Sequence, residues 1–237
     1  MDRLDKRLAA TGRWSRKEAR ELIRAGRVRV DGAVCRSPEE KAAEGAAVTV
    51  DGVEVEPQGP VYLMLNKPAG VVSSTDEPGE RTVLDLLGEA YQNIGLFPAG
   101  RLDKDTEGLL LLTDEGPLAH ALLSPKRHVD KIYYVRTAGR LTEEDCRAFA
   151  AGLSLEDGLT CLPAELEILS AGEESEAHVT LREGKFHQVK RMLASRGKPV
   201  LYLERIQMGA LPLDRGLRRG AFRFLTEEEI DGLRALV

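Results

Sequence analysis

The sequence has little of the chemistry that binds metals, forms disulfides or spans membranes. Its 237 residues include only three cysteines, Cys35, Cys146 and Cys161. Their odd number and wide spacing fit neither a metal-ligand pattern nor a disulfide framework, as expected in a reducing cytosol. The most apolar runs, residues 61–65 and 109–112, are far too short to cross a bilayer. We therefore expect no disulfide, no metal held by cysteine and no membrane partner.

The beginning of the chain also lacks the apolar core of a secretion signal, which favours a cytoplasmic location. Hydrophobic residues make up 42% of the chain and charged residues 31%, as in folded soluble proteins. A chain of this length forms either one large domain or a small domain joined to a medium one.

The net charge of -5 hides a strong asymmetry along the chain. Residues 1–30 hold ten lysines and arginines against four acids, and residues 181–223 hold eleven against three. Residues 138–180, by contrast, hold two against ten. Two basic segments in an acidic chain indicate localised contact with a polyanion. For either segment taken alone, a solvated charged surface is the alternative.

Residues 1–56 predict a small module of two helices followed by hairpins. Asp2 is a candidate cap for a short first helix, and Ser15 begins a capping box for a second helix that Gly26 ends. Two Asp-Gly pairs, Asp31-Gly32 and Asp51-Gly52, stand between valine-rich runs and are typical of hairpin turns.

The second predicted helix carries a row of arginines. Arg16, Arg20 and Arg24 recur every four residues, and Arg27 follows three residues later. Because residues at this spacing share one helix face, the four arginines are expected to form a basic arc with no acid within it. Such an arc suits contacts with phosphate groups, and a solvated charged face is again the alternative.

Residues 57–60 contain two prolines and a glycine and predict a linker. In residues 61–237, strands and helices then follow one another without regular alternation. This pattern predicts an α+β fold with a mostly antiparallel mixed sheet flanked by helices. Predicted strands are 61–65, 131–135, 178–181 and 200–206, and predicted helices are 116–123, 186–196 and those that begin at Thr142 and Thr226.

A polar loop that runs into four leucines is the most distinctive stretch of this second part. Residues 97–108 carry Arg101, three carboxylates and two glycines, and Leu109–Leu112 follow directly. Loops fixed to a rigid scaffold commonly display catalytic groups. From the residues alone, Asp103 in this loop has three interpretations: a calcium ligand, a turn residue, or a nucleophilic or acid–base carboxylate.

Calcium fits the spacing only in part. From Asp103 to Asp114 the oxygens and the glycine nearly match an EF-hand loop. The closing residue, however, is aspartate rather than the longer glutamate, the ninth position is Leu111, and Pro98 stands where a helix is required. Calcium is therefore disfavoured. The turn and the catalytic carboxylate both stay open, because nothing in the residues alone separates them.

Ordered motifs resemble known families over nearly the whole chain. Residues 1–56 resemble the S4-type RNA-binding domain, and residues 61–237 resemble the pseudouridine synthases. The S4-like segments are Arg3–Lys6, Ser15–Ala19 and Ile23–Gly32, and the synthase-like motifs are Asn66–Gly70, Gly100–Asp103 with Thr106 and Gly108, Lys131–Tyr133 and Glu183–Met192. Any one motif could arise by chance, but the ordered set is specific. It is most similar to the branch that modifies a uridine of small-subunit (16S) ribosomal RNA.

The resemblance implies isomerisation of uridine to pseudouridine, with no cofactor and no metal. Asp103 would be the catalytic carboxylate, either attacking the ribose or removing a ribose proton, and Lys190 would keep it ionised. Tyr133 would stack on the target base, and Arg101 would fill the gap left by the flipped nucleotide or hold the displaced backbone.

The expected RNA contacts extend over both parts of the chain. They are Arg3, Lys6, Ser15, Arg16, Lys17, Arg20, Arg24, Arg27, Lys67, Lys185, His187, Gln188 and Arg191. For Lys67, fixing the turn at Pro68 is the alternative role. The implied partner of this monomer is ribosomal RNA within a small-subunit assembly intermediate. Other possibilities are a large-subunit (23S) RNA target, or an inactive RNA-binding or assembly factor, which the intact set of Asp103, Tyr133 and Lys190 argues against.

Overall fold

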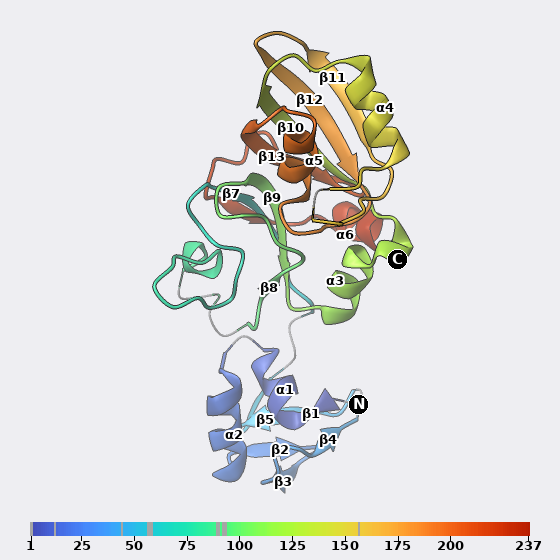
Figure 1. Ribbon diagram of the computed structural model, residues 1–237. Coiled ribbons are helices and arrows are strands. Elements are labelled where there is room, and N and C mark those ends of the chain that lie inside the picture. Colours follow the sequence, from blue (N-terminus) through green and yellow to red (C-terminus); the bar gives the residue numbers. More distant parts are fainter. Residues whose placement is uncertain are drawn as a thin grey trace. The chain divides into compact units, whose positions relative to one another are not determined.

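The computed structural model divides into two compact units (Figure 1). One unit comprises Met1–Val61 with Leu87–Phe97, and the other comprises Tyr62–Leu86 with Pro98–Val237. The linker predicted at 57–60 lies partly outside the described residues, so its boundaries stay a prediction. The structure describes residues 2–11, 13–43, 45–55, 59–88, 91, 94–155 and 157–237.

The first unit packs two helices against short strands. The elements are β1 (Asp2–Arg3), α1 (Leu4–Ala9), α2 (Arg16–Arg24), β2 (Val28–Val30), β3 (Ala33–Cys35), β4 (Lys41–Ala42), β5 (Val48–Val50) and β6 (Val53–Glu54). One sheet has the strand order β3-β2-β5-β6, and β1 pairs with β4. Leu4 and Leu8 of α1 pack with Ile23 of α2 and Val28 of β2 in a small core from which water is excluded.

The predicted turns and the second cap of this unit are confirmed, and the first cap is wrong. Both Asp-Gly pairs have positive φ at both residues, as type I′ hairpin turns require. The Ser15 hydroxyl accepts from the Glu18 backbone N–H in a complete capping box. Asp2, however, lies in β1, and α1 begins after Arg3 without a side-chain cap, because the chain first pairs with β4.

The second unit is built on a long mixed sheet flanked by helices, as predicted. Its strand order is β11-β12-β10-β13-β9-β7-β15, with β8 beside β9 and β14 beside β13. The strands are β7 (Tyr62–Lys67), β8 (Phe97–Pro98), β9 (Glu107–Thr113), β10 (Lys131–Ala138), β11 (Glu165–Ser170), β12 (Glu174–Leu181), β13 (Val200–Met208), β14 (Leu211–Pro212) and β15 (Phe222–Phe224). The helices are η1 (Leu84–Leu86), α3 (Gly116–Leu123), η3 (Pro125–Arg127), α4 (Glu143–Ala151), α5 (Gln188–Ser195) and α6 (Glu227–Arg234).

The leucine run is the centre of this sheet. Leu109–Leu112 form most of β9 and are fully buried on both faces. β9 pairs antiparallel with β7 and parallel with β13, whereas the other pairings of defined register in this sheet are antiparallel. A strand without polar alternation suits a position with both faces covered. The loop before β9 is thus attached to the most deeply buried strand of the unit.

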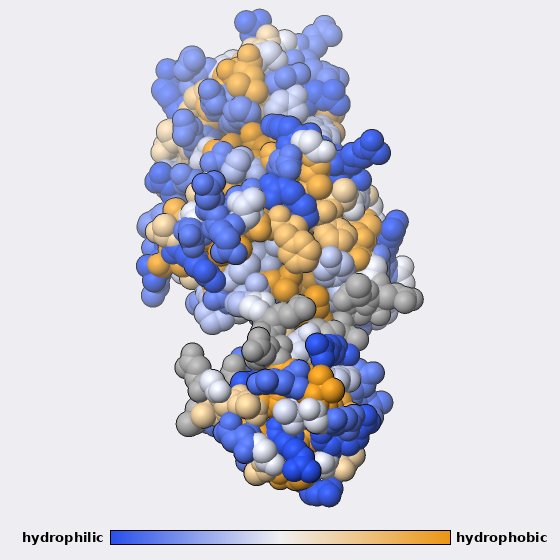
Figure 2. Space-filling view, turned by 180° about the vertical axis from the view of Figure 1, so that it is seen from behind, coloured by the Kyte–Doolittle hydropathy of each residue, from blue (hydrophilic) through white to orange (hydrophobic). Residues whose placement is uncertain are grey.

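Two predicted helix starts are confirmed and one is shifted. Thr142 and Thr226 each cap their helix in a capping box. The basic helix predicted from residue 186 begins at Gln188, because His187 takes a left-handed conformation and serves as its N-cap. None of the helices in the described residues is both long and apolar enough to cross a membrane. Hydrophilic residues predominate over the face shown in Figure 2, with apolar residues interspersed.

Candidate active site

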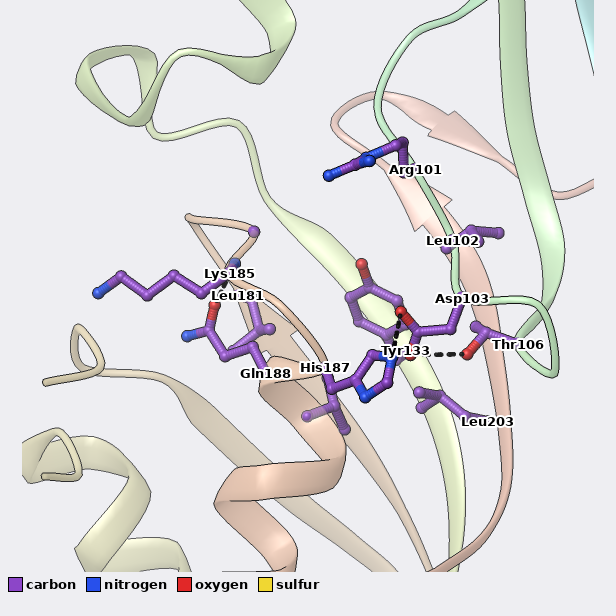
Figure 3. Close-up of a pocket in the computed structure, with 12 residues that line it drawn as sticks. Arg101, Leu102, Asp103, Thr106, Tyr133, Leu181, Lys185, His187, Gln188 and Leu203 are labelled. Carbon is purple, nitrogen blue, oxygen red and sulfur yellow. Dashed lines mark hydrogen bonds and ion pairs between the residues drawn. The ribbon is translucent and has the colours of Figure 1, made fainter. Parts of the chain in front are cut away.

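Asp103 lies in the loop between β8 and β9, at the wall of a pocket (Figure 3). Its side chain is 25% exposed. The Thr106 backbone N–H donates to the Asp103 carbonyl at 3.1 Å, and the Thr106 hydroxyl lies 3.5 Å from the Asp103 carboxylate. These contacts close a tight turn, which confirms the turn interpretation, and the turn presents the Asp103 carboxylate to a pocket, so its catalytic interpretation stays a prediction.

Lys67 holds this loop from within the protein. Its side chain is fully buried, and its ammonium donates to the carbonyls of Pro68, Asp103, Lys104 and Thr106 at 2.8–3.2 Å. Burial lowers the pKa of Lys67 to about 8, against the attraction of the nearby carboxylates. The expectation that Lys67 touches RNA is therefore wrong, because no part of the side chain reaches the surface. Its alternative role, fixing local backbone, extends from the Pro68 turn to the whole Asp103 loop.

The other end of the loop is fixed by a close approach between β9 and β13. Gly108 has a φ of +97°, and a Cβ there would lie 2.3 Å from the Arg205 carbonyl oxygen. The Arg205 guanidinium in turn donates to the Leu109 carbonyl at 2.8 Å. Only glycine combines this conformation with this separation, so Gly108 allows the parallel pairing that carries the loop.

Two basic side chains, from α5 and from its N-cap, lie close to the Asp103 carboxylate. The Lys190 ammonium of α5 lies 2.9 Å from Asp103 Oδ2 and 2.5 Å from Asp105 Oδ1. His187 Nε2 lies 3.6 Å from Asp103 Oδ1. α5 and the Asp103 loop are far apart in sequence, and the fold brings them together across the pocket.

Lys190 is shared between two unequal carboxylates. Partial burial favours its neutral form, but the carboxylates of Asp105 and Asp103 outweigh burial and raise the pKa of Lys190. For Asp105, partial burial opposes ionisation, yet the contact with Lys190 outweighs it and lowers the pKa. The Asp105 side chain is 74% exposed, so water also solvates it. The Asp103 side chain is the more shielded of the two from solvent.

Tyr133 forms the aromatic part of the pocket wall. It belongs to the buried face of β10, is 9% exposed, and its ring lies beside Asp103 (Figure 3). The pocket is lined by Arg101, Leu102, Asp103, Thr106, Tyr133, Leu181, Gly184, Lys185, His187, Gln188, Val189 and Leu203. One ionised carboxylate, an aromatic ring and apolar side chains can receive a flat, uncharged ring with an attached sugar.

The remaining predicted residues of this unit differ in exposure. Arg101 lines the pocket, is exposed, and has no ion pair to any residue that the structure describes. Lys185 is partly committed to Glu183, 2.9 Å away, and Arg191 pairs with Asp157. The Gln188 side chain is buried and hydrogen-bonded to Glu183 and to the Lys185 backbone. Gln188 therefore orders the loop before α5. Because its side chain is buried, it can meet RNA only as part of the pocket wall.

In the first unit, an acid from the neighbouring helix α1 lies against the arginine arc of α2, which the spacing within α2 could not predict. Asp5 of α1 is fully buried and pairs with Arg3, Arg16 and Arg20 at 2.9–3.5 Å. The expectation of an acid-free arc is wrong for this reason, although all three arginine side chains stay 40–53% exposed.

Other predicted RNA contacts of this unit fall into two groups. Arg27 pairs with Asp51, and the Ser15 hydroxyl is used in its helix cap. Lys6, Lys17 and Arg24 are exposed side chains.

Sequence reasoning missed one polar cluster beside the loop. Arg219 lies 2.9 Å from both Glu107 and Glu204, and the Tyr202 hydroxyl donates to Glu107 at 2.8 Å. The Ala69 backbone N–H also reaches Glu107, at 3.4 Å. The signal available in the sequence was the pair of acids, Glu107 and Glu204, in strands β9 and β13 that are otherwise largely apolar. Among the described residues, no three His, Cys, Asp or Glu side chains gather as a metal ion would require.

Comparison with known proteins gives the class of the molecule. Residues 2–48 match the S4 domain, and residues 61–195 match the RNA pseudouridylate synthase family. A crystal structure of a pseudouridylate synthase superposes with a TM-score of 0.69 at 35% identity, covering 98% of this chain and 100% of that one. Fold and site thus define an RNA-modifying enzyme with an S4 domain.

Whole-chain relatives give the same answer. An RNA pseudouridine synthase of Bacillus subtilis is 44% identical, covering 96% of each chain. The ribosomal small subunit pseudouridine synthase A of Vibrio cholerae is also 44% identical, covering 96% of this chain and 97% of its own. The ribosomal large subunit pseudouridine synthase B of Bacillus subtilis is 40% identical, covering 100% of this chain and 97% of its own. The chain belongs to the RNA pseudouridylate synthase family, which confirms the resemblance predicted from its motifs.

Proposed function

We propose that this enzyme converts a uridine of ribosomal RNA to pseudouridine, with Asp103 as the catalytic carboxylate. The observation that carries the proposal is the position of Asp103 in the pocket, 2.9 Å from Lys190 and beside Tyr133. The reaction needs one ionised carboxylate next to the ribose and a flat site for the base, and these residues supply both.

The isomerisation conserves every atom of the nucleotide. The bond between N1 and the ribose breaks, the uracil rotates, and a bond forms between C5 and the same ribose carbon. C5 then loses its proton and N1 gains one, so no oxidant, reductant or second substrate is consumed. Asp103 either attacks the ribose carbon or removes a ribose proton, and both routes require the ionised carboxylate.

Lys190 maintains that ionised state when RNA covers the pocket. Excluding water raises the free energy of an isolated carboxylate, and an adjacent ammonium offsets the increase. The Tyr133 ring offers a face on which the uracil stacks. A uridine within a helix must leave its stack to reach the pocket. Exposed Arg101, which forms no ion pair with the residues described, is suited to occupying the space left behind.

A small-subunit ribosomal RNA target is supported by several relatives. Three of the small-subunit synthases from Vibrio species are 42–44% identical to this chain. The large-subunit synthase of Bacillus subtilis, at 40% identity, supports the alternative target. Action as a monomer on an assembly intermediate in the cytoplasm stays a prediction.

The test is to map pseudouridines in both ribosomal RNAs from cells with and without the gene. Deletion is expected to remove one small-subunit pseudouridine, and wild-type protein but not Asp103→Asn is expected to restore it. Loss of a large-subunit site instead would contradict the target. An unchanged map would contradict the activity on ribosomal RNA, and restoration by Asp103→Asn would remove Asp103 from the mechanism.

A further inference from the structure

The most exposed large hydrophobic side chain in the described part of the chain stands beside the pocket. Phe186 is 73% exposed, and its two neighbours in sequence, Lys185 and His187, both line the pocket. Single exposed hydrophobic residues are common and need no explanation. The position of Phe186 and the arrangement of its ring, described next, are what distinguish it.

The Phe186 ring is held parallel to the His187 ring. Their centroids are 3.8 Å apart and the planes differ by 18°. His187 has a φ of +50°, a left-handed conformation that is costly for a residue with a side chain and that also begins α5. On its other side His187 approaches Asp103 at 3.6 Å. The stacked rings therefore lead outward from the catalytic carboxylate, ending in a phenylalanine.

One face of the Phe186 ring is covered by His187, and its large exposed fraction leaves the opposite face to solvent. The ring adds little to the apolar core. Proteins that bind single-stranded RNA use aromatic faces of this kind, because every base has a π-face that can stack on them.

We propose that Phe186 is a stacking site for a nucleotide adjacent to the target uridine. When the target base enters the pocket, its neighbour in the strand loses a stacking partner. The free face of Phe186 replaces that partner and fixes how the RNA strand passes the pocket. Exposed Arg101 lies at the same pocket and is available to the intervening phosphates. This inference rests on the active site proposed above.

Stacking would contribute to RNA binding rather than to the chemical step, because Phe186 does not line the pocket itself. It would also tolerate any neighbouring base, since no hydrogen-bonding group on Phe186 can read one. Phe186 is therefore a positioning residue, and its substitution should change affinity while leaving the turnover rate at saturating RNA nearly unchanged.

The test uses the full-length protein carrying Asp103→Asn, so that bound RNA is not converted. The probes are short oligouridylates in which one uridine is replaced by 2-aminopurine, a base whose fluorescence falls when it stacks. Phe186→Leu retains apolar bulk and removes the aromatic face. Phe224→Leu is the matched control, because Phe224 is an aromatic residue of β15 that is 56% exposed.

We expect Phe186→Leu to weaken RNA binding about tenfold and to abolish the fluorescence decrease, as loss of one stacked base would. Phe186→Trp should retain both, and Phe224→Leu should change neither. In the enzyme with intact Asp103, Phe186→Leu should raise KM about tenfold with kcat within about threefold.

Unchanged affinity and quenching in Phe186→Leu would overturn the proposal, as would equal weakening by Phe224→Leu. A urea-unfolding midpoint of Phe186→Leu equal to that of wild type shows that any change in RNA affinity comes from the lost ring and not from unfolding. Failure of the catalytic assignment is a separate result, because it appears as pseudouridine formation by Asp103→Asn whatever Phe186 does.

Discussion

Replacing Lys67 with methionine should disorder the Asp103 loop without changing the residues that line the pocket. Methionine retains most of the apolar stem but removes the ammonium that reaches four carbonyls, three of them in the Asp103 loop. The side chain is fully buried, so water cannot replace the lost donors unless the loop moves.

The expected loss of stability follows from two opposing terms. The three N–H groups of a charged donor contribute about 2 kcal/mol each, or about 6 kcal/mol. Keeping the buried side chain charged, after the attraction of the nearby carboxylates is included, costs about 3 kcal/mol, because its pKa falls from 10.5 to about 8. Lys67→Met should therefore lower the free energy of unfolding by about 3 kcal/mol.

The effect on catalysis should be larger than that of a general loss of stability. A displacement of about 1 Å at a reacting group costs about a hundredfold in rate, so we expect pseudouridine formation to fall ten- to a hundredfold at a temperature where the variant is folded. Urea unfolding and single-turnover kinetics measure the two effects. Lys104→Met is the control, because the Lys104 ammonium pairs with Glu80 at the surface of the same loop. Destabilisation below about 1 kcal/mol, with a rate within twofold of wild type, would refute the role of Lys67.

Three further predictions test other parts of the structure. Gly108→Ala should destabilise the protein by more than about 3 kcal/mol because its Cβ would meet the β13 backbone, whereas Gly116→Ala, in open space within α3, should be neutral or stabilising in thermal unfolding. Burial lowers the pKa of both Lys67 and Lys131 to about 8, so between about pH 8 and 10.5 the unfolded chain binds more protons than the folded one, and the free energy of unfolding should rise with pH. This rise should be about halved in Lys67→Met, and an unchanged rise would contradict the lowered pKa of Lys67. Asp5→Asn should release its arginine partners, lower the melting temperature and weaken RNA binding. Unchanged RNA affinity would contradict the role of Asp5 in placing these arginines for RNA binding.

The sequence predicted the features whose signals are local. The leucine run predicted a buried strand, the Asp-Gly pairs predicted their turns, and Ser15, Thr142 and Thr226 predicted helix starts, because each signal operates over a few neighbouring residues. Asp2 failed as a cap because pairing between β1 and β4 determined the conformation there.

The sequence predicted which residues form the candidate site, but not most of the contacts among them. The motifs singled out Asp103, Tyr133 and Lys190; in the fold Asp103 and Tyr133 line one pocket, and Lys190 contacts Asp103 at 2.9 Å. Nothing in the spacing indicated that Lys190 is shared with Asp105 or that His187 approaches Asp103, since these contacts join α5 and its N-cap to a loop far away in sequence.

Lys67 shows why charge alone misleads about function. A lysine after an apolar strand suggests a surface cation, yet its ammonium lies inside the protein and is bound by carbonyls that only the folded loop assembles. Likewise Asp5 neutralises arginines on a neighbouring helix, which no periodicity within that helix could reveal.

The most direct test of the central claim is a single-turnover measurement with Asp103→Asn. The RNA substrate carries tritium at C5 of its uridines, and the reaction releases it to water when C5 loses its hydrogen. We predict that the variant binds RNA within about threefold of wild type but releases tritium at least about a thousandfold more slowly. Tritium release within tenfold of wild type, at equal RNA occupancy, would contradict a catalytic role for the Asp103 carboxylate.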